Sequence, residues 1–246
     1  MPDLSVSIVS HRQAALVHDL LNDLQQHCPQ QDMEVLLTLN LEESLPFDPA
    51  QFSFQLRVLR NISPKGFGAN HNAAFAYAKG AHFCILNPDI RLHDNPFPTL
   101  LHYLDNHNLG LIAPMVLSPE GACEDSARRF PRPGEIIAKV FGGQSATIPP
   151  GKGPLTYPDW LAGMFLLLPS TLFRRLHGFD ERYFLYYEDV DLCARLKLAG
   201  ERIARCNEVK VVHAAQRSSH RNLRYLRMHL GSMLRFFTSD VFRRLP

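Results

Sequence analysis

Three carboxylates fall within four consecutive positions in Glu188-Asp189-Val190-Asp191. Tyr186 and Tyr187 come directly before them, and the apolar spacing that follows predicts a helix over Val190–Ala199 that stops at Gly200. Acids at the start of a helix can serve as caps and as partners of the helix dipole. Three acids exceed what capping requires. We therefore expect one of them to act as a general base whose affinity for a proton is raised by the aromatic neighbours.

A further carboxylate, Asp89, follows an apolar run in the segment Asn87-Pro88-Asp89, where proline stiffens the turn. A divalent cation that bridges a diphosphate needs a hard oxygen ligand on a rigid turn, and it keeps positions for phosphate oxygens and water. A plain surface turn is the alternative.

His213 ends the apolar run Val209–Val212 and could complete a site for Mg²⁺ or Mn²⁺ with Asp89, although a lone histidine is more often structural.

The segment Lys65-Gly66-Phe67-Gly68-Ala69-Asn70-His71-Asn72 precedes an Ala-rich stretch. Its glycines permit close backbone approach where a helix N-terminus favours an anion, and a generic turn is the alternative. The spacing is not that of a P-loop, which disfavours an ATPase.

Trp160 with Arg128 and Arg129 could line an acceptor or diphosphate pocket, or could be a core tryptophan and two solvated arginines.

Strands that alternate with helices would position these residues. We expect strands over Leu4–Val9, Val35–Leu39, Phe54–Leu59, Phe83–Leu86, Leu109–Leu117, Trp160–Leu168 and Val209–Val212, and helices over Leu16–Leu24, Ala69–Ala78, Pro169–Leu176 and Val190–Ala199. This alternation predicts an α/β fold with a mostly parallel central sheet flanked by helices. Ligands of such sheets bind beyond the carboxyl ends of the strands, where Asp89 falls. Residues 118–158 are rich in Pro and Gly and predict an irregular insertion.

The charge is unevenly distributed along the 246 residues. Of the 26 basic and 24 acidic residues, the stretch 217–246 holds seven arginines and one acid, Asp240, so this tail carries +6 and residues 1–216 carry −4. We expect one domain over 1–216 and a basic amphipathic helix over 217–246 that packs on it or extends from it. Such a helix fits an anionic membrane surface, with a packing helix or a dimer contact as alternatives.

The five cysteines are scattered and lack metal-binding spacing, which suggests a reducing compartment. No secretory leader and no apolar stretch of about 18 residues is found, so we expect neither export nor a membrane span. The expected location is the cytoplasm, peripheral to the inner face of the cell membrane. No nucleic-acid partner is expected.

The motifs in chain order carry a resemblance. They are Gly66-Phe67-Gly68 with Asn70 and Asn72, Leu86-Asn87-Pro88-Asp89, Trp160-Leu161-Ala162-Gly163, Gly178-Phe179-Asp180-Glu181-Arg182-Tyr183-Phe184 and Glu188-Asp189-Val190-Asp191-Leu192-Cys193. Over about residues 5–237 the chain resembles the inverting glycosyltransferases of family 2, which have the GT-A fold. It looks most like the bacterial rhamnosyltransferases that build O-antigen and related polysaccharides, which would place it in lipopolysaccharide biosynthesis.

The resemblance implies roles for individual residues. Asp89 would bind the metal as the second Asp of the family's Asp-x-Asp motif, with Asn87 in place of the first, and His213 would reach the same ion. Asp189 would be the catalytic base, oriented by Glu188. The implied donor-binding residues are Asn40, Gly66, Phe67, Gly68, Asn70, Asn72, Asn87 and Asp89. Apart from the resemblance, the residues that we expect to bind the acceptor are Trp160, Asp191, Arg128 and Arg129.

One departure concerns the nucleotide base. The family usually ends its second strand with Asp-Asn, whereas this sequence reads Leu39-Asn40, followed by Glu42 and Glu43, which could substitute. The implied reaction is transfer of L-rhamnose from dTDP-L-rhamnose to a polyprenyl-diphosphate-linked saccharide with Mg²⁺ or Mn²⁺. The alternatives are a UDP-sugar transferase for N-acetylglucosamine or galactose, a nucleotidyltransferase, or a non-catalytic subunit that binds sugar nucleotides.

Overall fold

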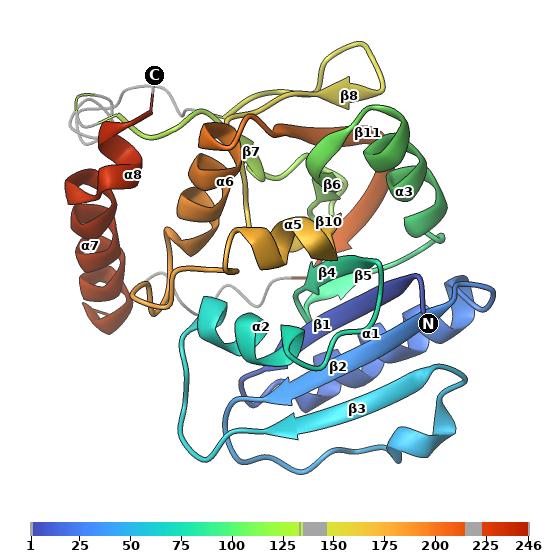
Figure 1. Cartoon of the computed structure of the whole chain (residues 1–246). Helices are drawn as coiled ribbons and strands as arrows, with labels where there is room; N and C mark the ends of the chain where they lie inside the picture. Colours follow the sequence, from blue (N-terminus) through green and yellow to red (C-terminus); the bar gives the residue numbers. More distant parts are fainter. Residues whose placement is uncertain (1, 133, 135–146, 215–222, 246) are drawn as a thin grey trace.

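The computed structural model describes residues 2–132, 134, 147–214 and 223–245 (Figure 1). The strands are β1 (Leu4–Ser10), β2 (Met33–Leu39), β3 (Gln55–Arg60), β4 (His82–Leu86), β5 (Ile90–Arg91), β6 (Leu109–Leu117), β7 (Ala127–Arg128), β8 (Leu155–Thr156), β9 (Trp160–Leu161), β10 (Phe165–Pro169) and β11 (Arg202–His213). The helices are α1 (Ala14–His27), η1 (Pro49–Gln51), α2 (Phe67–Phe75), α3 (Phe97–Asn106), α5 (Ser170–Arg175), α6 (Glu188–Leu198), α7 (Leu223–Thr238) and α8 (Asp240–Arg243).

The main sheet has the strand order β3-β2-β1-β4-β10-β6-β11-β5, and β8 pairs with β11 at one side. Strands β1 to β4 run parallel to one another, and β6 and β11 run parallel to each other. Strand β10 is antiparallel to both β4 and β6. The group β1 to β4 therefore runs in the same direction as the pair β6 and β11. The expected mostly parallel α/β sheet is therefore confirmed, and the carboxyl ends of β1, β2 and β4 lie at the same edge.

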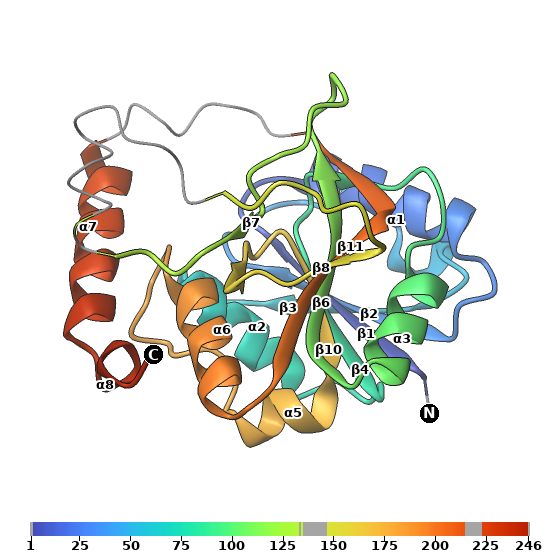
Figure 2. The same ribbon diagram turned by 90° about the horizontal axis from the view of Figure 1, so that it is seen from above.

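Helices cover both faces of this sheet (Figures 1 and 2). Alternate residues of β4 explain this arrangement, because Cys84 and Leu86 pack with α1 and α3, whereas Phe83 and Ile85 pack with α2, α5 and α6. Side chains on a strand alternate between faces, so a fully apolar strand requires a cover on each side.

The predicted strand Trp160–Leu168 is wrong as a single element. Trp160 and Leu161 form β9, which pairs with β7 in a separate two-stranded sheet, and the main-sheet strand β10 begins only at Phe165. The two apolar halves belong to different sheets, so the chain must turn between them at Ala162–Met164. The apolar pattern alone carried no sign of this turn.

The C-terminal part forms two helices rather than one. Phe236 of α7 is buried in a small cluster with Tyr183 and Tyr187, and Phe242 of α8 packs against the same cluster. In both views α7 stands at the periphery, with α6 on its inner side (Figures 1 and 2). The expected boundary at residue 216 lies outside the described residues and stays a prediction.

Candidate active site

The first cluster of site residues lies where β5 pairs with β11. This pairing sets His213 opposite Ile90, which is the residue that follows Asp89 in the sequence. His213 Nε2 lies 3.2 Å from Asp89 Oδ2, and His213 Nδ1 lies 2.7 Å from Glu124 Oε2. Burial opposes a proton on His213, but the hydrogen bonds and charges of Asp89 and Glu124 outweigh it and raise the pKa of His213 to about 9.

Two observations bear on whether this corner fits a divalent cation. Asp89 Oδ1 is buried and has no hydrogen-bond partner among the described residues, so the carboxylate keeps one oxygen for a ligand. The described part of the chain contains no group of three or more His, Cys, Asp or Glu side chains arranged to hold a metal. The free oxygen of Asp89 fits an ion that takes most of its ligands from diphosphate and water. His213 can join it only after losing the proton that Asp89 and Glu124 stabilise, and an ion bound here stays a prediction.

The second cluster is the acidic pair at the start of α6. Glu188 is buried with its Oε2 unpartnered among the described residues, while Asp189 is half-buried. Asp189 Oδ2 accepts from Gly163 N at 3.0 Å and Oδ1 accepts from Val190 N at 2.9 Å. Burial raises the pKa of Asp189, and these backbone donors oppose the rise. Burial and the charge of Asp189 raise the pKa of Glu188 well above its usual value.

The residues before this pair form an unusual backbone, which we call the tyrosine turn. Tyr186 and Tyr187 have φ values of 69° and 68°, a left-handed conformation that non-glycine residues adopt at a cost. Tyr187 is the residue that directly precedes α6. The turn therefore fixes the direction in which the chain enters the acidic pair.

The turn Ala162–Met164 connects the two clusters. Met164 O accepts from Asn87 N at 2.9 Å, two residues before Asp89, and Gly163 N donates to Asp189. A Cβ added at Gly163 would lie 3.2 Å from the ring of Phe67. We call the cluster of Asp89, Glu124 and His213 the metal corner, after the ion that is predicted there. Hydrogen bonds from this one turn thus hold both the strand end before the metal corner and the acidic pair.

The predicted donor-binding asparagines are mostly engaged within the protein. Asn40 Oδ1 accepts from Lys65 N at 2.8 Å and from Asn61 Nδ2 at 2.9 Å, and Asn40 Nδ2 donates to Lys65 O at 3.0 Å. Asn61 Nδ2 also lies 2.7 Å from Asn70 Oδ1. These amides hold together the loops after β2 and β3, so contact of Asn40 or Asn70 with a nucleotide stays a prediction.

The glycines Gly66 and Gly68 allow close packing of the chain on itself. A Cβ on Gly66 would lie 2.6 Å from Phe184 O, and one on Gly68 would lie 2.5 Å from Phe179 Cβ. Asn72 belongs to the same contact, because its Oδ1 accepts from Phe179 N at 2.8 Å and its Nδ2 donates to Phe179 O at 2.9 Å. This segment binds the loop that leads to the tyrosine turn, and a donor contact of these residues stays a prediction.

Three of the predicted acceptor-binding residues come together. Arg128 pairs with Trp160 across the β7–β9 ladder, and its guanidinium lies 5.3 Å from the indole centroid. Trp160 Nε1 donates to Arg129 O at 2.9 Å, while the Arg129 side chain is exposed. The charge of Arg128 acts on Asp189 and helps to lower its pKa against the effect of burial.

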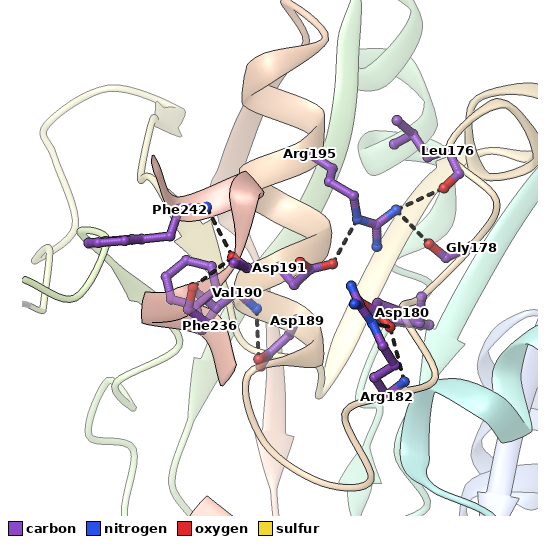
Figure 3. A network of polar contacts seen from close by, with 12 residues as sticks. Leu176, Gly178, Asp180, Arg182, Asp189, Val190, Asp191, Arg195, Phe236 and Phe242 are labelled. Carbon is purple, nitrogen blue, oxygen red and sulfur yellow. Dashed lines mark hydrogen bonds and ion pairs between the residues drawn. The ribbon is translucent and has the colours of Figure 1, made fainter. Parts of the chain in front are cut away.

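Asp191, the fourth predicted acceptor residue, is held by a structural network (Figure 3). It is 1% exposed, and its Oδ2 accepts from Arg195 Nε at 2.7 Å. Arg195 Nη1 in turn donates to Leu176 O and Gly178 O, both at 2.8 Å. The carboxylate points along α6 toward this arginine, so a contact with an acceptor stays a prediction.

The sequence reasoning missed Glu124 and Asn61. Glu124 lies in the irregular insertion, and a bridge between Leu117 and Cys123 with Glu124 N donating to Val116 O brings it beside His213. No local pattern marks this position, because the contact depends on how the chain reverses after β6. Asn61 follows β3 as Asn40 follows β2, and this shared place at a strand end was a usable signal.

Comparison with known proteins defines the class. GalNAc-T7, solved with UDP, GalNAc and Mn²⁺, superposes with a TM-score of 0.71 at 14% identity, over 96% of this chain and 48% of that one. Mannosyltransferase PcManGT from Pyrobaculum calidifontis, solved with GDP-Man and Mn²⁺, gives a TM-score of 0.64 at 16% identity, over 95% and 64%. The fold is the GT-A fold of glycosyltransferases.

Sequence comparison then gives the family. Rhamnosyltransferase WbbL of Escherichia coli (strain K12) is 33% identical over 186 residues, 70% of this chain and 69% of the relative. An N-acetylglucosaminyl-diphospho-decaprenol L-rhamnosyltransferase of Mycobacterium tuberculosis (strain ATCC 25618 / H37Rv) is 30% identical over 154 residues, 56% of this chain and 48% of the relative. Residues 5–153 match the model of Glycosyl transferase family 2, and the chain belongs to that family of enzymes.

Proposed function

We propose that the protein transfers L-rhamnose from dTDP-L-rhamnose to a polyprenyl-diphosphate-linked saccharide during synthesis of a cell-surface polysaccharide. The observation that carries the proposal is the turn Ala162–Met164, which ties the strand end with Asp89 to the base candidate Asp189. The relatives that are named rhamnosyltransferases support the choice of sugar. The lipid-linked acceptor follows from the name of the mycobacterial relative.

Asp189 is the proposed general base. Its raised pKa makes it a better proton acceptor than an exposed aspartate, and the two backbone donors hold its carboxylate in one orientation. It takes the proton of the acceptor hydroxyl, whose oxygen attacks the anomeric carbon while the bond to the nucleoside diphosphate breaks. A single displacement of this kind inverts the configuration. Glu188 is buried beside Asp189, and burial favours its protonated form.

Asp89 and His213 are the proposed ligands of Mg²⁺ or Mn²⁺. When bound, such an ion supplies positive charge next to the diphosphate that leaves. The chain's own part is to keep the free Oδ1 of Asp89 and the His213 ring at one place on the sheet edge. Arg128 and Trp160 are proposed to line the side on which the acceptor enters, where the charge of Arg128 acts on Asp189.

The C-terminal helix is the proposed membrane contact, which would put the enzyme at the inner face of the cell membrane where lipid-linked acceptors are found. Its arginines fit an anionic surface. No helix within the described residues is long and apolar enough to cross a membrane. The proposed peripheral location rests on the arginines of the C-terminal helices.

The test is a transfer assay with dTDP-L-rhamnose, Mn²⁺ and a synthetic polyprenyl-diphosphate N-acetylglucosamine. The expected products are dTDP and a rhamnosylated lipid. Asp189→Asn should keep dTDP binding and lower kcat by about 10²-fold or more, because general-base catalysis contributes roughly 10²–10⁴-fold. Asp105→Asn, an exposed carboxylate on α3, is the matched control and should keep full activity.

Other outcomes would reject the proposal. Transfer only from UDP-N-acetylglucosamine or UDP-galactose would change the donor and leave the family mechanism in place. Release of pyrophosphate would point to nucleotidyl transfer. Full activity of Asp189→Asn would remove this residue from the mechanism, and donor binding without turnover by the wild-type chain would indicate a non-catalytic subunit.

A further inference from the structure

The outer face of α7 exposes a row of three leucines, which we call the leucine stripe. Leu226, Leu230 and Leu234 are 53%, 47% and 65% exposed. They are spaced four residues apart, so they follow one another along one side of the helix. Large aliphatic side chains in a continuous exposed row indicate a surface that is covered in use.

Exposed positive charge lies on the same two C-terminal helices, with Arg227 directly after Leu226. Arg227 and Arg235 on α7 and Arg243 on α8 are exposed. The sequence 223–245 contains five arginines and one acid, Asp240, which pairs with Arg243 at 3.0 Å. An apolar row beside cations complements an anionic bilayer, where leucines enter the acyl boundary and arginines meet the headgroups.

The opposite face of α7 holds the tyrosine turn. Ser232 Oγ donates to Leu185 O at 2.8 Å. The ring of His229 lies 5.2 Å from that of Tyr186 and 5.5 Å from that of Tyr187. Phe236 is fully buried, with its ring 5.6 Å from that of Tyr187. The helix therefore contacts three successive residues directly before the acidic pair.

This contact has energetic consequences for the site. Two successive residues in the left-handed region persist only where surrounding contacts outweigh the strain. The contacts of α7 with this turn are side-chain contacts from a single helix at the periphery of the molecule (Figures 1 and 2). Whatever restrains α7 also restrains the backbone that leads into Glu188 and Asp189.

We propose that an anionic lipid surface binds the leucine stripe, and that docking of α7 steadies the tyrosine turn through the opposite face of the same helix. The helix thus links membrane contact to the order of the catalytic acids. The inference rests on the proposed function, because it takes Glu188 and Asp189 as the reaction centre. The first test of the inference needs neither donor nor acceptor. The inference can therefore fail while the proposed function holds.

That test combines vesicle binding with hydrogen–deuterium exchange of the whole chain. Vesicles of phosphatidylglycerol should bind the protein at low salt, more weakly in 0.5 M salt, and vesicles of phosphatidylcholine should bind it weakly. On the anionic vesicles, peptides that cover residues 183–189 should exchange more slowly. Leu226→Ser/Leu230→Ser/Leu234→Ser should keep its melting temperature, bind roughly 10-fold or more weakly and lose this protection.

Ser232→Ala separates the two faces of the helix. It should bind anionic vesicles like the wild type, while residues 183–189 exchange roughly 5-fold faster, as expected from the loss of one hydrogen bond. Absence of vesicle binding at low salt would overturn the docking surface. Binding without slower exchange at 183–189 would overturn the link. A dimer that the triple leucine variant abolishes would assign the stripe to a second copy of the chain instead.

Discussion

Replacement of Glu124 by glutamine tests how the metal corner is built. The Glu124 carboxylate lies 2.7 Å from His213 Nδ1, which turns Nε2 toward Asp89 at 3.2 Å. Loss of such an outer partner of a metal-binding histidine weakens metal affinity by about 10–100-fold. Because the Glu124 side chain is 26% exposed and water can replace part of its contact, we expect about 10–30-fold, or about 1.4–2 kcal/mol.

The assay is a titration with Mn²⁺ in the presence of saturating dTDP, followed by electron paramagnetic resonance of the free ion at fixed pH and salt. Glu120→Gln removes an exposed carboxylate from the same loop and should leave the Kd within twofold. In a His213→Ala background, Glu124→Gln should have no further effect, because the residue acts through His213. A Kd for Glu124→Gln within twofold of wild type would refute this role for Glu124.

Three further predictions concern stability. Burial lowers the pKa of His71 to about 3, against about 6.5 in an unfolded chain, so the unfolded state binds the extra proton below pH 6.5. From pH 6.5 to 5 the wild type should lose about 1.7 kcal/mol that His71→Asn keeps, measured by urea unfolding at both pH values; equal losses would contradict the shift. Gly66→Ala sets a Cβ 2.6 Å from Phe184 O and should cost at least about 2 kcal/mol in the same measurement. Asp191→Asn removes the negative charge that is paired with Arg195 and should lower stability by about 3 kcal/mol with little change in acceptor KM, whereas the reverse result would favour a direct acceptor contact.

Much of the sheet follows from the sequence because buried parallel strands are continuous apolar runs. Leu4–Ser10, Met33–Leu39 and His82–Leu86 lie within a few residues of their predicted ranges. The position of Asp89 follows from the same pattern, since a residue after such a run lies at the carboxyl edge of the sheet. The resemblance to family 2 is likewise confirmed by the match over residues 5–153.

What the sequence did not predict depends on contacts between distant segments. Asn72 binds Phe179, which is 107 residues away, so spacing gave no reason to assign its amide to protein packing. A Cβ added at Gly66 or Gly68 would meet Phe184 or Phe179, a close contact that the sequence did not reveal, while donor binding by these glycines stays a prediction. A glycine pattern signals close approach of some group but does not identify that group.

The same contacts explain why the motifs of this chain occur as a set. Gly66 packs against the loop that ends in the tyrosine turn, where Phe67 N donates to Phe184 O at 2.9 Å. That turn sets the entry to Asp189, which accepts from Gly163, and the residue after Gly163 accepts from Asn87. Each motif therefore fixes the backbone of the next. A substitution in the glycine segment should disturb the base and the metal corner together, although neither Gly66 nor Phe67 need touch the sugar.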